Sequence, residues 1–276
     1  MTHVERAGLE LLRRTVGQRT ASRVAYVYRD RVLSSAEALS YGADPRGRWS
    51  KKRLDAVRGQ YRGERCFIIG NGPSLNEMDL GALRGKYTFA LNRGYLLFDR
   101  IGAPTSFLVA VNRYVVEQFA DDILAADTET FVSWRSRRWV PKGADFTYIR
   151  RGRLHTFSTD LARQGAWEGA TVTYVALQLA YHLGFTDVIL IGVDHSFSTH
   201  GPANKLVTAS SDDPNHFDPA YFGAGVKWQL PDLEVSEISY KLARRAYEAD
   251  GRTVRDATVG GKLTVFPKVA YDLVTR

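Results

Sequence analysis

A buried-strand pattern that runs straight into a glycine turn constrains this chain more than any other feature. Residues 66–69 read Cys-Phe-Ile-Ile, an apolar run typical of a strand covered on both faces. Residues 70–74 read Gly-Asn-Gly-Pro-Ser. Gly70 and Gly72 lack a Cβ and leave room beside the main chain, while Pro73 and Ser74 suit the first turn of a helix. The pattern predicts a strand, a tight turn and a helix, with a phosphate or ribose site where the strand ends.

The spacing of these glycines separates the turn from two common phosphate loops. It is neither the Gly-x-Gly-x-x-Gly of dinucleotide-binding folds nor the phosphate loop that ends in Gly-Lys-Ser/Thr. Asn71 stands between the two glycines and offers both a donor and an acceptor. The same pattern is also typical of a turn with a purely geometric role, so both interpretations stay open at this point.

Strand and helix patterns alternate along the rest of the chain. We expect strands at residues 66–69, 87–91, 106–111, 130–132, 146–149, 188–193 and 253–254. We expect helices at residues 50–58, 75–83, 94–101, 114–125, 174–183 and 233–249. Such alternation predicts a Rossmann-like α/β fold, a mostly parallel sheet with helices on both faces.

The pattern also suggests how the chain is divided. Residues 1–60 carry helical spacing, interrupted by a turn-rich hinge at 42–47, and are expected to form a helical N-terminal extension. Residues 61–276 are expected to form a nucleotide-binding α/β domain, with a loop-like lid at about 197–230. The 276 residues, 44% of them apolar, suffice for one large core.

A second candidate site lies in the middle of the chain. Gly169, Thr171 and Thr173 open a helical pattern, where free amides, hydroxyls and the helix dipole favour an anion. Asp194 and His195 follow the next apolar strand pattern. Because parallel strands end at one edge of a sheet, we expect these residues to face the same crevice as the first glycine turn.

Composition bears on compartment and partners. The single cysteine, Cys66, excludes an intrachain disulfide, and the first residues lack the pattern of a signal peptide, so we expect a cytoplasmic protein. The formal net charge of +8 is concentrated at residues 46–65 and 135–153. No nucleic-acid motif accompanies these basic clusters, so we expect no nucleic-acid partner and favour an anionic substrate or the inner face of a membrane. We also expect a homo-oligomer.

The order of these motifs resembles a known family. Gly70-Asn71-Gly72-Pro73-Ser74, then Asn92 and Asn112 after the next two strands, then Asp194, is similar to the family 42 sialyltransferases. It also resembles the proteins with domain of unknown function 115, which include motility-associated glycosyltransferases and hydroxymethyl-dihydropterin diphosphokinases. The likeness extends over residues 65–266 and implies a variant of the GT-A-like fold.

The resemblance implies a function and a binding site. The chain would move a sugar, a sialic-acid-like acidic one, from a CMP-activated donor to a glycan or lipid-linked acceptor, with no metal ion or other cofactor required. Gly70, Asn71, Gly72 and Ser74 would hold the phosphate and ribose of the donor. Asn92 and Asn112 would contact its nucleotide and sugar, and Gly169, Thr171 and Thr173 would complete the site. Ser196 and Phe197 stand where the family has an aromatic pattern, and Tyr221 is the nearest substitute.

An inverting transfer needs a base for the acceptor hydroxyl, and histidine suits that task. The family takes this base from the lid, so we rank His216 first, then His195 and His200. Asp194, beside His195, completes the set of catalytic candidates.

Two other functions stay open. Asp194, Asp212, Asp213 and Asp218 would instead hold Mg²⁺ in an ATP-dependent diphosphokinase acting on a pterin-like molecule. The chain would alternatively be a nucleotide-binding module without catalysis.

Overall fold

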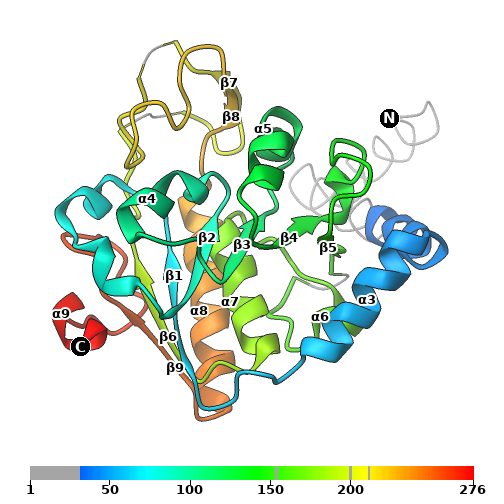
Figure 1. Cartoon of the computed structure of the whole chain (residues 1–276), viewed down its shortest axis with the longest axis horizontal. Helices are drawn as coiled ribbons and strands as arrows, with labels where there is room; N and C mark the ends of the chain where they lie inside the picture. The colour runs from blue at the N-terminus through cyan, green and yellow to red at the C-terminus, as the bar shows by residue number, and fades with distance from the viewer. Residues whose placement is uncertain (1–31, 153–154, 199–200, 211) are drawn as a thin grey trace, which may run out of the picture.

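The computed structural model describes residues 32–152, 155–198, 201–210 and 212–276, and its centre is a seven-stranded sheet (Figure 1). The strand order is β5-β4-β3-β2-β1-β6-β9, and every neighbouring pair is parallel. The strands are β1 (Arg65–Ile69), β2 (Tyr87–Leu91), β3 (Phe107–Ala110), β4 (Glu129–Ser133), β5 (Phe146–Ile149), β6 (Asp187–Ile191) and β9 (Thr253–Asp256). The predicted α/β fold with a parallel sheet is confirmed.

The sheet is buried on both faces because its strands are apolar at successive positions. On β1, Cys66 and Ile68 belong to one core cluster, whereas Phe67 and Ile69 belong to the other. All four side chains are at most 1% exposed. Since burial of such a side chain stabilises the fold by about 1.5–3 kcal/mol, the run fits a central strand far better than a surface one.

Helices cover the two faces. The core cluster that contains Cys66 and Ile68 lies between one face of the sheet and four helices: α3 (Pro45–Val57), α6 (Leu161–Gln164), α7 (Val172–Leu183) and α8 (Leu233–Ala249). The second is formed with α4 (Phe98–Ile101), α5 (Arg113–Ala125), α9 (Tyr271–Thr275) and the short 3-10 helices η1 (Pro73–Glu77), η2 (Leu80–Leu83), η3 (Gly94–Leu97) and η4 (Trp134–Ser136). None of the described helices combines the length and apolar character needed to cross a membrane.

The N-terminal part departs from the prediction at the hinge. Residues 32–43 are helical, and a new helix, α3, begins directly after Asp44. The Asp44 side chain accepts a hydrogen bond from the Arg46 N–H. Pro45 at the first helical position supplies the rest of the start signal, so the predicted hinge at 42–47 is narrowed to a helix break at Asp44. The division into residues 1–60 and 61–276 stays a prediction, and residues 1–31 lie outside the described residues.

Two predicted helices are shorter than expected. The pattern at 75–83 is divided between η1 and η2, because Met78 is extended and Asp79 caps a new turn through the Gly81 N–H. The pattern at 94–101 begins as η3 and continues as α4, which ends at Gly102 with φ of 78°.

The predicted lid, residues 197–230, contains more regular structure than expected. β7 (Leu206–Thr208) and β8 (Lys227–Gln229) form an antiparallel pair, and Figure 1 shows this pair standing clear of the main sheet. Between the two strands, Phe217 and Tyr221 are buried against the second core cluster. Movement of this segment as a lid stays a prediction.

Candidate functional site

The strand order places a crevice between β1 and β6. From β1 the chain adds β2 to β5 on one side, and then returns to place β6 and β9 on the other. The turns that follow β1 and β6 touch each other, since the Gly70 N–H donates to the Ile191 carbonyl at 2.7 Å and the Gly72 N–H donates to the Gly192 carbonyl at 2.9 Å. Ligands of open α/β sheets bind at such a reversal of strand order.

The glycines of the turn are required by the neighbouring loop. A Cβ on Gly70 would lie 2.2 Å from the Gly192 oxygen, and one on Gly72 would lie 1.7 Å from Asp194 Oδ2. Neither glycine has a positive φ. The sequence pattern predicted that these two glycines leave room for a ligand. In the structure they leave room for the loop after β6, which contains Gly192 and Asp194 and is called the β6 loop below.

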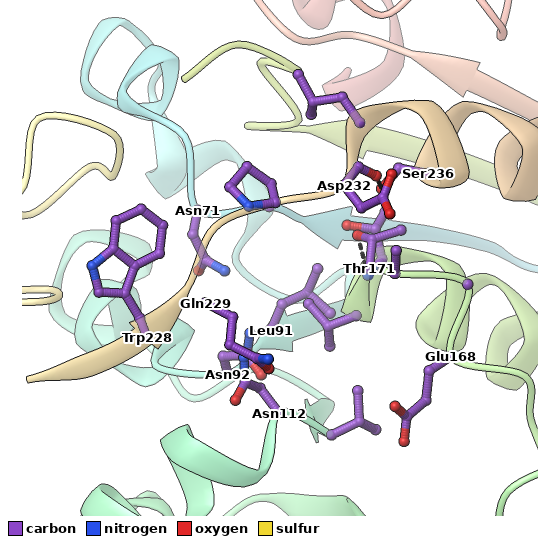
Figure 2. A pocket seen from close by; sticks show the side chains of 18 of the residues that line it. Asn71, Leu91, Asn92, Asn112, Glu168, Thr171, Trp228, Gln229, Asp232 and Ser236 are labelled. Carbon is purple, nitrogen blue, oxygen red and sulfur yellow. Dashed lines mark hydrogen bonds between the residues drawn. The ribbon is translucent and has the colours of Figure 1, made fainter. Parts of the chain in front are cut away.

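A cavity of about 720 Å³ opens at this crevice. Figure 2 shows its side chains coming from two sides, with Asn71, Asn92 and Asn112 on the turns after β1, β2 and β3, and Thr171, Asp232 and Ser236 beside α7 and α8. Of the residues predicted from the sequence, the lining includes Gly70, Asn71, Gly72, Asn92, Asn112, Gly169, Thr171, Thr173, Asp194, His195 and His216. The structure thus brings these eleven predicted residues together at one cavity.

Ser74 is the exception. Its hydroxyl donates to Asp194 Oδ2 at 2.8 Å, and its N–H donates to Asp194 Oδ1 at 3.1 Å. Burial raises the pKa of the Asp194 carboxyl, and the hydrogen bonds from Ser74 oppose that shift. Ser74 therefore connects the β1 turn to the β6 loop, and its predicted contact with a phosphate or ribose stays a prediction.

Two asparagine side chains on the cavity wall carry buried oxygens without a partner. Among the described residues, Asn71 Oδ1 and Asn92 Oδ1 are buried and accept no hydrogen bond. Leaving such an oxygen unpaired costs about 1–3 kcal/mol. Because both residues line the cavity, each oxygen would gain a partner when its side chain turns toward an N–H or O–H group of a bound molecule. Asn112 differs, because its oxygen caps α5 by accepting from the Tyr114 N–H at 2.9 Å.

The start of α7 forms another part of the wall. Thr171 caps the helix by accepting from the Thr173 N–H at 3.3 Å, and its hydroxyl lies 3.4 Å from the Tyr240 hydroxyl. Gly169 and Ala170 lead into the cap with φ of 55° and 61°. The helix begins at Val172, two residues earlier than predicted. Its N-terminal end lies at the cavity, where the helix dipole favours an anion.

His216 is held on two sides. Its Nδ1 lies 2.6 Å from Oδ2 of Asp213, and that carboxylate side chain is 3% exposed. The Tyr221 ring stacks on the imidazole, with ring centres 4.1 Å apart and an interplanar angle of 8°. Because the carboxylate accepts a hydrogen bond from Nδ1–H, the ring proton is on Nδ1 and the lone pair of Nε2 can accept a proton from another molecule.

His195 forms a second histidine–carboxylate pair at the same cavity. Its Nε2 lies 3.2 Å from Glu237 Oε1 on α8, and its backbone φ is 54°. His200, the third histidine considered, lies outside the described residues. Among the described residues, four non-glycine residues of the cavity wall have positive φ: Asn92, Ala170, His195 and Asn204. Such strained backbone is concentrated at functional sites.

Sequence reasoning missed the partners of the histidines. Asp213 precedes His216 by three residues, and this spacing was the available signal for the pair. Glu237 was a surface position of a predicted helix, and no local pattern connects it to His195. Within the described ranges, no group of three or more His, Cys, Asp or Glu side chains is arranged to hold a metal ion.

Comparison with known proteins gives structural likeness alone. No family model matches this chain. No curated protein matches it either. Among solved structures it is similar to the sialyltransferase CstII from Campylobacter jejuni in complex with a substrate analogue, cytidine-5'-monophosphate, with 15% identity over 77% of this chain and 87% of that chain, at a TM-score of 0.43. It is also similar to the sialyltransferase CST-II in complex with trisaccharide acceptor and CMP, with 15% identity over 76% of this chain and 87% of that chain, at a TM-score of 0.43.

Proposed function

We propose that this protein transfers a sugar from a nucleotide-activated donor, a CMP-linked acidic sugar, to a hydroxyl group of a glycan or lipid-linked acceptor. One observation carries the proposal. The cavity at the strand-order reversal combines buried amide oxygens that need donors with a histidine whose Nδ1 is held by a buried carboxylate. The amide oxygens suit the N–H and O–H groups of a nucleotide, and the oriented histidine suits a general base.

The nucleotide would lie between the turns after β1 and β2 and the start of α7. Asn71 and Asn92 would accept from its hydroxyl or amino groups, and the phosphate would lie at the N-terminus of α7 near Thr171 and Thr173. The choice of cytidine follows the motif order from Gly70 to Asp194 described in the sequence. The acidic sugar and the acceptor class are parts of the same proposal.

His216 would act as the base. Its Nε2 takes the proton of the acceptor hydroxyl while the acceptor oxygen bonds to the anomeric carbon of the sugar. The bond between that carbon and the phosphate oxygen breaks, and its electron pair leaves with CMP. Asp213 stabilises the imidazolium that forms and keeps the ring oriented.

A thermal-shift series with nucleotides tests the proposal. At a CMP concentration 100 times Kd, binding should raise the free energy of unfolding by about 2.7 kcal/mol, with EDTA present to remove Mg²⁺. Asn71→Ala should abolish the shift, because it removes a side chain whose buried oxygen awaits a donor. Gln60→Ala, which changes an exposed amide away from the cavity, should keep it.

The same series separates the competing functions. Stabilisation by ATP with Mg²⁺, and none by CMP, would contradict sugar transfer and favour the diphosphokinase. Stabilisation by CMP without cleavage of any CMP-sugar, in the presence or absence of acceptors, would favour a binding module. We further propose a cytoplasmic homo-oligomer that associates with an anionic membrane through the basic residues of α3.

A further inference from the structure

Arg93 is a buried cation next to the cavity that the proposed chemistry leaves unused. It is 9% exposed and is not part of the cavity wall. In the described ranges no carboxylate forms an ion pair with it. A buried charge without an ionic partner is costly, so its other contacts must compensate.

Those contacts lie on the segment that carries His216. The Arg93 guanidinium donates to the Ala220 carbonyl at 2.9 Å and also to the Tyr221 carbonyl. The main-chain N–H of Arg93 donates to the Tyr221 hydroxyl at 3.3 Å. Arg93 therefore holds Tyr221 at both its carbonyl and its hydroxyl end.

The remaining contacts fix the guanidinium itself. Its central carbon lies 3.9 Å from the centre of the Phe119 ring on α5, and Nε donates to the Tyr95 hydroxyl at 3.2 Å. Tyr95 in turn donates to Asp122 at 3.2 Å. A planar guanidinium can stack on a ring while Nε and Nη1 donate to separate partners, which the single nitrogen of a lysine ammonium cannot do.

We propose that Arg93 is the positioning residue of His216. It holds Tyr221, the Tyr221 ring supports the imidazole by a parallel stack, and Asp213 holds that imidazole in its plane. The segment has a further attachment, since the Phe217 N–H donates to the Asn71 carbonyl at 2.9 Å. The inference rests on the proposed function only for the role of His216 as base.

Arg93→Lys tests the inference. The charge stays, but the stack on Phe119 and the Nε bond to Tyr95 are lost, so the group that holds the two carbonyls is no longer fixed. We expect kcat for sugar transfer to fall by about 10- to 100-fold, because small misplacements of a reacting group have effects of that size. KM for the donor and the stabilisation by CMP should stay unchanged, since Arg93 does not line the cavity.

The decisive measurement is the NMR spectrum of the His216 imidazole, assigned by its loss in His216→Gln. The Nδ1 proton bonded to Asp213 should shift or exchange faster in Arg93→Lys. Arg252→Lys is the matched control: Arg252 also donates to two carbonyls, those of Tyr181 and Phe185, and lies 4.0 Å from an aromatic ring centre, but far from the cavity in the fold. That variant should leave the imidazole signals and kcat as in the wild type.

Unchanged His216 signals and unchanged kcat in folded Arg93→Lys would overturn the inference, as would equal changes in Arg252→Lys. If Arg93→Lys does not fold, Tyr221→Phe replaces it. This variant removes the hydroxyl to which the Arg93 main-chain N–H donates and keeps the ring, so it weakens the same support of the imidazole and should change the same signals. The NMR result stands whether or not sugar transfer is found, which separates failure of this inference from failure of the proposed function.

Discussion

At the scale of single residues, His216 and its two neighbours are the most specific feature of the site. A surface histidine usually has water on most sides, whereas this side chain is 12% exposed and is fixed by Asp213 and Tyr221. An oriented imidazole with a free Nε2 is the arrangement that general-base catalysis requires.

We expect His216→Gln to lower kcat for sugar transfer by about 10²- to 10⁴-fold, the usual contribution of a general base. Stabilisation by CMP should persist, because the side chain is assigned to the acceptor side of the reaction. Steady-state kinetics with thermal shift on the same sample measures both. His195→Gln is the comparison: a large loss in that variant with little loss in His216→Gln would assign the base to His195.

At the scale of elements, the β1 turn and the β6 loop act as one unit. Hydrogen bonds hold three loops together. The Gly70 and Gly72 N–H groups donate to main-chain carbonyls at the end of β6, Ser74 donates to Asp194, and the Lys262 N–H donates to the Asp194 carbonyl. The cavity wall at the crevice depends on this packing.

Gly70→Ala should therefore destabilise the protein by about 1–3 kcal/mol, the usual effect of overpacking, because the new Cβ would meet main-chain atoms of the β6 loop. Urea unfolding measures the change. Gly42→Ala is the matched control, since nothing lies within 4 Å of its Cβ position and the residue is helical. It should be neutral or stabilising by up to about 1 kcal/mol. A neutral Gly70→Ala would show that the two loops have room to separate.

At the scale of the whole molecule, His182 connects α3 to the sheet domain. Its Nε2 lies 2.9 Å from the Leu54 carbonyl on α3, and its Nδ1 accepts from the Leu161 N–H at 3.3 Å. Both contacts suit the neutral ring with its proton on Nε2. Burial lowers the pKa of His182 below 6.5.

Stability should consequently fall as the pH is lowered. Below pH 6.5 the unfolded chain binds a proton that the folded chain does not, so this contribution is present above that pH and is lost as the pH falls through the folded pKa. Because of this one group, the free energy of unfolding changes by up to about 1.4 kcal/mol per pH unit. His182→Gln keeps a donor and an acceptor but does not titrate. Its urea-unfolding free energy should depend less on pH between 5 and 8, and parallel curves for the two proteins would contradict this role.

Much of the fold could be predicted from the sequence alone. The seven strands of the main sheet were predicted within about two residues of their bounds, whereas β7 and β8 were not predicted. The helices α7 and α8 followed from apolar spacing with Gly184 and Asp250 at their ends. The crevice could be predicted too, because parallel strands end at one edge and polar residues follow β1, β2, β3 and β6. These signals are local, since a strand run or a helix cap is set by neighbouring residues.

The tertiary structure decided what depends on contacts between distant segments. The pairing of β1 with β6, the approach of Gly72 to Asp194, the hydrogen bonds from Ser74 to Asp194 and the support of His216 by Arg93 through Tyr221 all join residues more than 100 positions apart. No periodicity encodes such pairs, because burial and hydrogen bonding across the core select them only when the chain has packed. The sequence by itself determined the glycine turn and the edge of the sheet where it lies. The packing of the β6 loop against this turn decided that the turn forms one wall of the cavity.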